Sequence, residues 1–152
     1  MHPILQQIDS ELQMNKTDAE LRYKFALRCI EEVASNLEED RAIESFQKFK
    51  SCVNSFSDQS IETLNHLATD LKKIAQSHPG SKSIDGTKHA AVSATYALAK
   101  AVEGDAVQAA AYAAYSSLYG YGGYAVKDPE AFAEVHEKQL RYLSQLISAQ
   151  TP

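Results

Sequence analysis

Histidines are the residues of this chain best suited to acid–base or metal chemistry near neutral pH, and the sequence contains five. Three of them, His66, His89 and His136, fall in three different predicted helices. Helical metalloproteins hold an ion with imidazoles that converge in this way, although none of the three has the glutamate three residues earlier that a di-iron site uses. A three-histidine site therefore stays open. The alternative is that His66 and His136 are partly exposed and that His89 is a hydrogen-bonded core or boundary residue.

A glycine-rich stretch, Tyr119–Tyr124, superficially suggests a phosphate-binding loop. No Gly-Lys-Ser or Gly-Lys-Thr ending follows it and no strand is predicted before it, so neither a P-loop nor a dinucleotide fingerprint fits. We predict an interhelical connection that presents Tyr119, Tyr121 and Tyr124 on a backbone of small residues. Tyrosine offers a large contact area and a hydroxyl with few rotatable bonds, which makes these three side chains candidate anchors for a protein partner.

Further tyrosines precede this connection at helical spacing. Tyr112, Tyr115 and Tyr119 follow one another at three- and four-residue steps, so they share a helix face, and Tyr96 on the preceding helix can join them. With His89, the side chains of Tyr96, Tyr112 and Tyr115 could line a pocket. Aromatic residues at this spacing also commonly form core, and both interpretations stay open.

An acidic cluster spans the end of one predicted helix and the start of the next, and comprises Glu31, Glu32, Glu38, Glu39 and Asp40. Such clusters are usually solvated surface. The functional alternative is an interaction surface for a basic partner, because acidic side chains accelerate the association of positively charged proteins.

Catalytic nucleophiles are not indicated by the sequence. No spacing suggests a Ser, His and acid arrangement, or a cysteine with a nearby base, so we predict neither an enzyme nor a bound cofactor or metal. Cys29 and Cys52 fall at apolar helical spacings and lack a paired framework, and we expect both thiols to be reduced and largely buried.

Composition limits the function classes. The chain has 152 residues, of which 44% are hydrophobic and 23% charged, as in one soluble globular domain. Fifteen basic and twenty acidic residues leave a net charge of −5, and no segment gathers the basic residues that nucleic acid requires. The start of the chain lacks signal-peptide features and no apolar run is long enough for a membrane span, so we expect a cytoplasmic protein that binds neither nucleic acid nor membrane.

The elements that position these residues are all predicted to be helices, because apolar residues recur with a period near 3.6 and no stretch alternates. We expect an all-α fold, a compact bundle of six or seven helices in a single domain, 1–152. It comprises an N-terminal helix or arm (1–16), Leu/Phe-rich helices (17–77), and an Ala/Tyr-rich helical hairpin with a C-terminal helix (84–148). The expected helices cover residues 4–14, 17–37, 40–56, 58–77, 85–102, 105–118 and 128–148.

Capping signals support these boundaries. Thr17 and Glu20 have the spacing of a capping box at the second helix. Gly104 is placed to end one Ala-rich helix and Asp105 to cap the next, which predicts an antiparallel hairpin. Asp128 precedes Pro129 at the start of the last helix. The buried face of that helix is predicted to comprise Phe132, Val135, Leu140, Leu143, Leu146 and Ile147.

Four segments together resemble the immunity-protein-five-like family of bacterial polymorphic toxin systems. They are LRYKFALRCIE (Leu21–Glu31), DRA (Asp40–Ala42), KHAAVSATYALA (Lys88–Ala99) and AAAYAAY (Ala109–Tyr115). The resemblance covers roughly residues 18–145, and its more distinctive parts are Glu31 and the Asp40-Arg41 and Lys88-His89-Ala90 steps. The family's usual tryptophan in the third helix is absent here.

The resemblance implies a cytosolic protein that binds a cognate toxin stoichiometrically and catalyses no reaction. Within this interpretation, the acidic cluster would accelerate encounter with the toxin and the tyrosines of Tyr119–Tyr124 would hold the complex. Two alternatives remain from other classes. One is a helical bundle that binds a metal or small ligand, with or without enzymatic activity, and the other is a self-associating bundle whose tyrosine face forms a homodimer contact.

Overall fold

A computed structural model describes residues 1–77, 87–121 and 125–150 of the chain and confirms the all-α fold. The described part contains seven α-helices and two short 3₁₀ helices and no strand. Their bounds are α1 Pro3–Met14, α2 Ala19–Glu31, η1 Ala34–Asn36, α3 Asp40–Asn54, α4 Ser60–Ser77, α5 Thr87–Glu103, α6 Ala106–Tyr121, η2 Ala125–Lys127 and α7 Pro129–Ala149. No helix in these residues is long and apolar enough to cross a bilayer.

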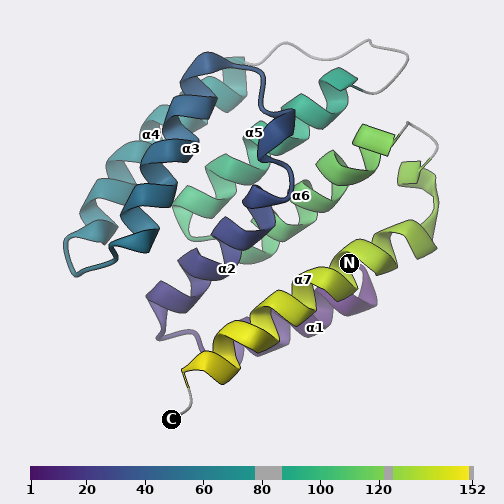
Figure 1. Ribbon diagram of the computed structural model, residues 1–152, viewed down its shortest axis with the longest axis horizontal. Coiled ribbons are helices and arrows are strands. Elements are labelled where there is room, and N and C mark those ends of the chain that lie inside the picture. Colours follow the sequence, from purple (N-terminus) through teal and green to yellow (C-terminus); the bar gives the residue numbers. More distant parts are fainter. Residues whose placement is uncertain (78–86, 122–124, 151–152) are drawn as a thin grey trace.

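The predicted Ala-rich hairpin, α5 and α6, lies at the centre of the bundle (Figure 1). Alanines on both helices are almost fully buried, and their small side chains let the two helices pack closely. The turn between them is a Schellman motif, in which Gly104 N–H donates to Ala101 O at 3.1 Å and Asp105 N–H to Lys100 O at 3.0 Å. Gly104 has a φ of 88°, so the prediction of a helix-ending glycine is confirmed.

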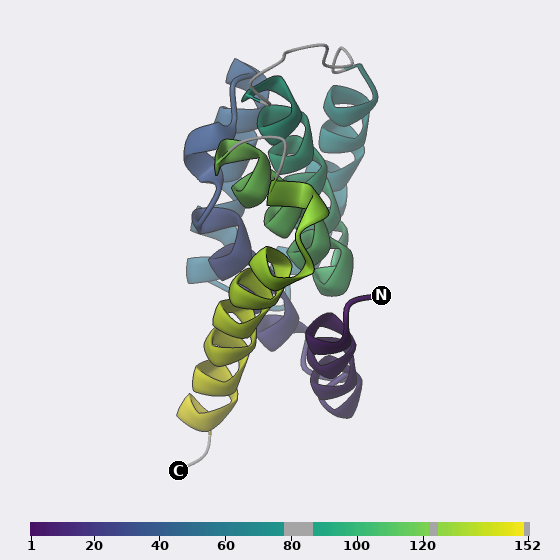
Figure 2. The same ribbon diagram turned by 90° about the vertical axis from the view of Figure 1, so that its right-hand side faces the viewer.

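Two helix pairs flank this hairpin. The pair α3 and α4 packs against α5, whereas α1 and α7 pack against each other and against α6, and α2 contacts both groups. Figures 1 and 2 show α1 and α7 side by side at one end of the molecule, away from α3 and α4. One buried hydrophobic cluster extends from Leu5 in α1 through the central helices to Leu143 in α7.

Two of the predicted caps are confirmed and one is wrong. Asp105 Oδ1 accepts from Gln108 N–H at 3.1 Å, and Asp128 Oδ1 accepts from Glu130 N–H at 3.0 Å. The second helix is capped one residue later than predicted, because Asp18 rather than Thr17 accepts from the Leu21 N–H, at 3.0 Å. An aspartate caps as well as a threonine, and the structure uses the residue that directly precedes the helix.

The second helix also ends earlier than its apolar pattern predicts. It stops at Glu31, and η1 then turns the chain toward α6. Val33 and Leu37 stay buried because the turn keeps both on the core. The side-chain amide of Asn36 donates to Ser116 Oγ at 3.0 Å, and Ser116 Oγ donates to Ala90 O at 2.7 Å. These hydrogen bonds connect η1 to both helices of the central hairpin.

Candidate functional site

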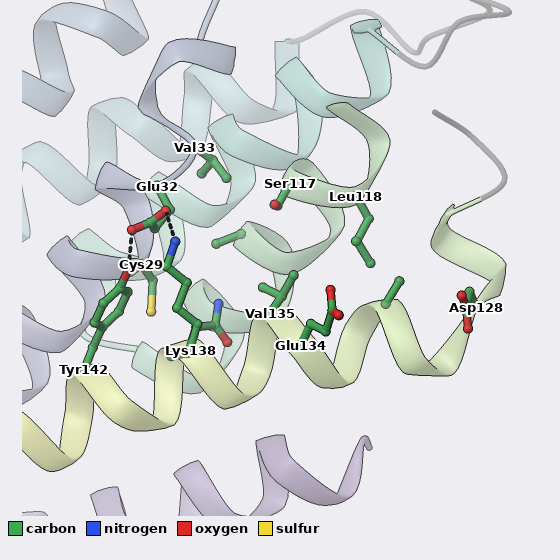
Figure 3. A pocket seen from close by; sticks show the side chains of 13 residues that line it. Cys29, Glu32, Val33, Ser117, Leu118, Asp128, Glu134, Val135, Lys138 and Tyr142 are labelled. Atoms are coloured by element: carbon green, nitrogen blue, oxygen red, sulfur yellow. Dashed lines mark hydrogen bonds and ion pairs between the residues drawn. The ribbon is translucent and has the colours of Figure 1, made fainter. Parts of the chain in front are cut away.

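The candidate site is a groove of about 590 Å³ between the end of α2, the end of α6 and one side of α7 (Figure 3). Its surface combines apolar side chains with acids, a lysine and a tyrosine. The lining residues are Cys29, Glu32, Val33, Ala113, Ser117, Leu118, Asp128, Ala131, Glu134, Val135, Lys138, Gln139 and Tyr142. We refer to it as the α2–α7 groove.

Glu32 is the central polar residue of the groove. It directly follows the last residue of α2. Its carboxylate points across the groove toward α7 (Figure 3). Lys138 Nζ donates to Glu32 Oε2 at 3.0 Å, and the Tyr142 hydroxyl donates to Glu32 Oε1. Arg28, one turn before Glu32, places its guanidinium carbon 4.4 Å from the centre of the Tyr142 ring. Arg28 on α2, Glu32 directly after it, and Lys138 and Tyr142 on α7 therefore form one cluster of charged and polar side chains.

Contacts within this cluster shift the pKa values of Glu32, Lys138 and Tyr142 further from pH 7. The hydrogen bond from Tyr142, followed by the contact with Lys138, lowers the pKa of Glu32 below its ordinary value of 4.5. The bond with Glu32 raises the pKa of Lys138, and burial together with that same carboxylate raises the pKa of Tyr142. At neutral pH the cluster thus holds a carboxylate, an ammonium and a neutral phenol.

The thiol of Cys29 lies at the wall of the groove. Its side chain is 1% exposed and free of any disulfide, as expected. Burial, reinforced by the nearby Glu32 carboxylate, raises the pKa of Cys29 far above that of an ordinary thiol. The thiolate is therefore disfavoured, and Cys29 is a packing residue. Cys52 is also free but only partly buried, so the expectation of burial is correct in full only for Cys29.

Two polar residues of α7 are buried as a pair, which the sequence analysis did not predict. His136 Nδ1 lies 2.8 Å from Gln139 Oε1, and Gln139 Nε2 donates to Ala110 O on α6 at 3.0 Å. His136 is 2% exposed, so its predicted partial exposure is wrong. Of the six residues predicted to form the buried face of α7, Leu143 is fully buried and the other five are partly buried. Three of those five, Leu140, Leu146 and Ile147, pack against the core. His136 and Gln139 also lie on the buried side of α7, where the Gln139 side-chain oxygen is within hydrogen-bond distance of the imidazole.

The acidic cluster is divided by the structure. Glu31 forms an ion pair with Lys50 of α3 at 3.4 Å, and Glu32 belongs to the groove. Glu38, Glu39 and Asp40 are exposed at the start of α3 and make no ion pair with any described residue. The acids therefore continue along the chain from the edge of the groove to a second, unneutralised patch.

The predicted tyrosine surface differs most from the structure. Tyr119 and the backbone of Tyr121 belong to α6, not to a connection, because the helix continues past Leu118. Tyr119 is half-buried and stacks on His89, with ring centroids 5.0 Å apart. The Tyr121 side chain and all of Tyr124 lie outside the described residues.

The candidate tyrosine pocket separates into two groups. Tyr96 and Tyr112 stack on each other at 5.6 Å between α5 and α6. Tyr115 stacks on Tyr119 at 6.4 Å and is 44% exposed, so it belongs with His89 to a different row of rings. The residues His89, Tyr96, Tyr112 and Tyr115 are therefore not brought together around one pocket.

The three histidines of the metal hypothesis are likewise separated. His66 is exposed on α4, His89 stacks on Tyr119, and His136 is bonded to Gln139. Among the described residues, no group of three or more His, Cys, Asp or Glu side chains is placed to hold a metal ion.

Lys138 and Tyr142 are the groove residues that the sequence analysis missed. The two are four residues apart, so they share one face of the last helix. That spacing is visible in the sequence, but nothing in it indicates that this face meets the acidic end of α2, which lies more than 100 residues earlier.

No protein-family model, curated protein or solved structure matches this chain.

Proposed function

We propose that this protein binds a cognate bacterial toxin and neutralises it stoichiometrically, with the α2–α7 groove as the contact surface. The observation that carries the proposal is the state of the groove's polar groups. Glu32 accepts hydrogen bonds from Lys138 and Tyr142, so charged and hydrogen-bonding groups are fixed beside the apolar side chains that line the groove. A surface of this kind supplies fixed charges and hydrogen-bonding groups for recognition of a protein partner.

The neighbouring acids supply the second part of the proposal. Glu38, Glu39 and Asp40 are solvent-exposed, and the chain as a whole has a net charge of −5. Unneutralised carboxylates attract a basic protein over a distance of about a Debye length, roughly 8–10 Å at physiological salt. We therefore infer a toxin domain with a basic surface, which the acidic patch attracts and the groove retains.

The groove is tested by filling it. Ala131 lines the groove on α7, whereas Ala133, two residues later, is absent from its lining. The partner for the assay is a toxin domain encoded beside this protein's gene. We expect Ala131→Arg to weaken its binding roughly tenfold or more through faster dissociation. Ala133→Arg adds the same charge and bulk to the same helix and should bind as the wild type does.

The acidic patch is tested by neutralisation. Replacing Glu38 and Glu39 by Gln and Asp40 by Asn should slow association roughly tenfold at low salt, and the difference should shrink as salt is added. The matched control neutralises three other exposed acids, namely Asp58, Glu62 and Asp70. This control changes the net charge equally but leaves the patch intact.

The outcomes separate the hypotheses. Protection of cells from the toxin by the wild type, but not by folded Ala131→Arg, would support the proposal. No binding of any neighbouring toxin by folded wild-type protein would overturn it. Mass in solution, measured alongside, tests the homodimer alternative, because a dimer that Ala131→Arg dissociates would assign the groove to self-association.

A further inference from the structure

A second cavity lies across α7 from the groove, between α1, α6 and the start of α7. Its volume is about 470 Å³, within the roughly 300–1,000 Å³ of small-molecule sites. The residues that line it include four aromatic or imidazole rings and no acid, in a chain with twenty acidic residues. They are Met1, His2, Leu5, Gln108, Ala111, Tyr115, Val126, Lys127, Pro129, Phe132 and His136. We refer to it as the ring-lined cavity.

The rings form a continuous row. The His2 and His136 centroids are 5.1 Å apart, those of His136 and Phe132 6.2 Å, and those of Phe132 and Tyr115 5.0 Å. Tyr115 is 44% exposed, and the row continues beyond the cavity because Tyr115 also stacks on Tyr119. A planar ligand could stack or pack edge-to-face on such a row, as aromatic side chains do on one another.

The hydrogen bonds of the two imidazoles set their tautomers. Gln139 donates its amide N–H to Ala110 O, so its oxygen faces His136 and must accept from Nδ1–H. His2 Nδ1 instead accepts from the Ile4 N–H at 3.1 Å, which leaves the proton of the neutral ring on Nε2. His2 therefore presents an Nε2–H donor, and neutral His136 presents an Nε2 lone pair that becomes a donor on protonation.

The charge of the cavity is positive. Lys127 of η2 is the one lysine or arginine among its lining residues, and the neighbouring Asp128 caps the Glu130 N–H and lines the α2–α7 groove instead. The remaining ionisable residues that line the cavity are Met1, through its amino group, and His2 before α1, Tyr115 on α6 and His136 on α7. An anion would therefore meet cationic or donor groups and no carboxylate.

We propose that the ring-lined cavity is a binding site for a small aromatic carboxylate. The ligand's ring packs against Phe132 and Tyr115, and its carboxylate pairs with Lys127 and with the imidazole N–H groups of His2 and protonated His136. This inference does not depend on the proposed toxin binding, because the two cavities lie on different sides of α7.

The proposed site has a pH dependence of definite sign. Burial, with a smaller contribution from His2, lowers the pKa of His136, so without ligand this ring is neutral at neutral pH. A bound carboxylate favours the imidazolium and raises that pKa. Linkage then requires binding to strengthen as the pH falls from 7.5 toward 6.

The experiment titrates the full chain with benzoate, at pH 7.5 and 6.0, by calorimetry and by NMR of the histidine Cε1–H signals. Benzamide, with the same ring and no charge, and acetate, with the charge and no ring, are the matched probes. We expect saturable benzoate binding that is tighter at pH 6.0, with both other probes weaker.

Substitutions locate the site. We expect Lys127→Gln to weaken benzoate binding roughly two- to fivefold and Phe132→Leu roughly two- to tenfold. Lys73→Gln, at an exposed lysine on α4, should have no effect. Circular dichroism and melting confirm that each variant is folded, and Lys127 is exposed, so its replacement should not perturb the core.

Three results would overturn the proposal: no saturable benzoate binding, equal binding of benzoate and benzamide, or binding that neither Lys127→Gln nor Phe132→Leu weakens. Toxin binding by the same preparation is scored separately. Loss of benzoate binding with toxin binding intact would reject this site alone.

Discussion

Replacement of Gly104 by alanine tests the geometry of the central hairpin on which both cavities depend. The residue has a φ of 88°, where an L-residue with a Cβ is disfavoured by about 1–2 kcal/mol. An added Cβ would also lie 3.2 Å from the Tyr23 hydroxyl oxygen and 3.5 Å from the adjacent ring carbon. We therefore expect Gly104→Ala to lower the free energy of unfolding by about 1–2 kcal/mol. The close approach to Tyr23 should account for about 0.2–0.4 kcal/mol of this, and the left-handed backbone for the rest.

Gly120→Ala is the matched control. Gly120 lies in the last turn of α6, and the nearest atom to an added Cβ is Asn36 Nδ2 at 3.8 Å, an ordinary contact. Alanine favours helix over glycine, so this variant should be neutral or up to about 1 kcal/mol more stable. The two substitutions are chemically identical, and we expect only Gly104→Ala to lower stability.

The assay is urea unfolding followed by circular dichroism, together with thermal melting. For a chain of this size, Gly104→Ala should lower Tm by about 3–6 °C. A double-mutant cycle with Tyr23→Phe removes the hydroxyl and isolates the contact, and this second substitution should recover only a few tenths of a kcal/mol. If Gly104→Ala were as stable as the wild type, or if both glycine variants shifted Tm equally, the left-handed turn would be refuted.

Three further predictions concern the buried polar and thiol groups. Gln139→Leu leaves the His136 Nδ1–H without its acceptor and should cost about 1–3 kcal/mol in urea unfolding, whereas Gln145→Leu, at an exposed position of the same helix, should cost little. Burial lowers the pKa of His136 below 6.5, so the folded state favours the neutral imidazole. The contribution of His136 to the free energy of unfolding is therefore complete above pH 6.5 and declines as the pH falls toward the native pKa. Unfolding measured across pH 5–8 should be less pH-dependent in His136→Gln. Thiol labelling of native protein should be slow at Cys29 and faster at Cys52, and rapid labelling of both would contradict the burial of Cys29.

Helix positions are largely predictable because they depend on local chemistry. The 3.6-residue periodicity, the caps at Asp105 and Asp128 and the glycine at 104 all act within a few residues, and each appears in the structure as predicted. Errors arise where several local solutions are similar in energy. Thr17 and Asp18 are both good caps, and the apolar pattern through Leu37 does not distinguish a longer helix from a helix followed by η1.

The candidate sites are predictable only in part. The acidic end of α2 is identifiable from the sequence, but its partners Lys138 and Tyr142 are not. The sequence places the tyrosine anchors in a connection because glycine commonly ends a helix, whereas here α6 continues through Gly120 to Tyr121. The burial of Gln139 is not predictable from the sequence. A polar side chain on α7 is expected at the surface unless a group on another helix forms a hydrogen bond with it.

The sequence alone therefore determined the all-α class, the alanine-rich hairpin and the acidic composition, since propensity, periodicity and charge are properties of neighbouring residues. Only the tertiary structure decided which helix faces meet. Glu32 and Tyr142 are separated by 110 positions, and His2 and His136 by 134, yet each pair is in contact. Contacts of that range depend on how whole helices pack around the Ala-rich centre. The spacing of residues along the chain indicates which face of a helix is apolar, but not which other helix that face packs against.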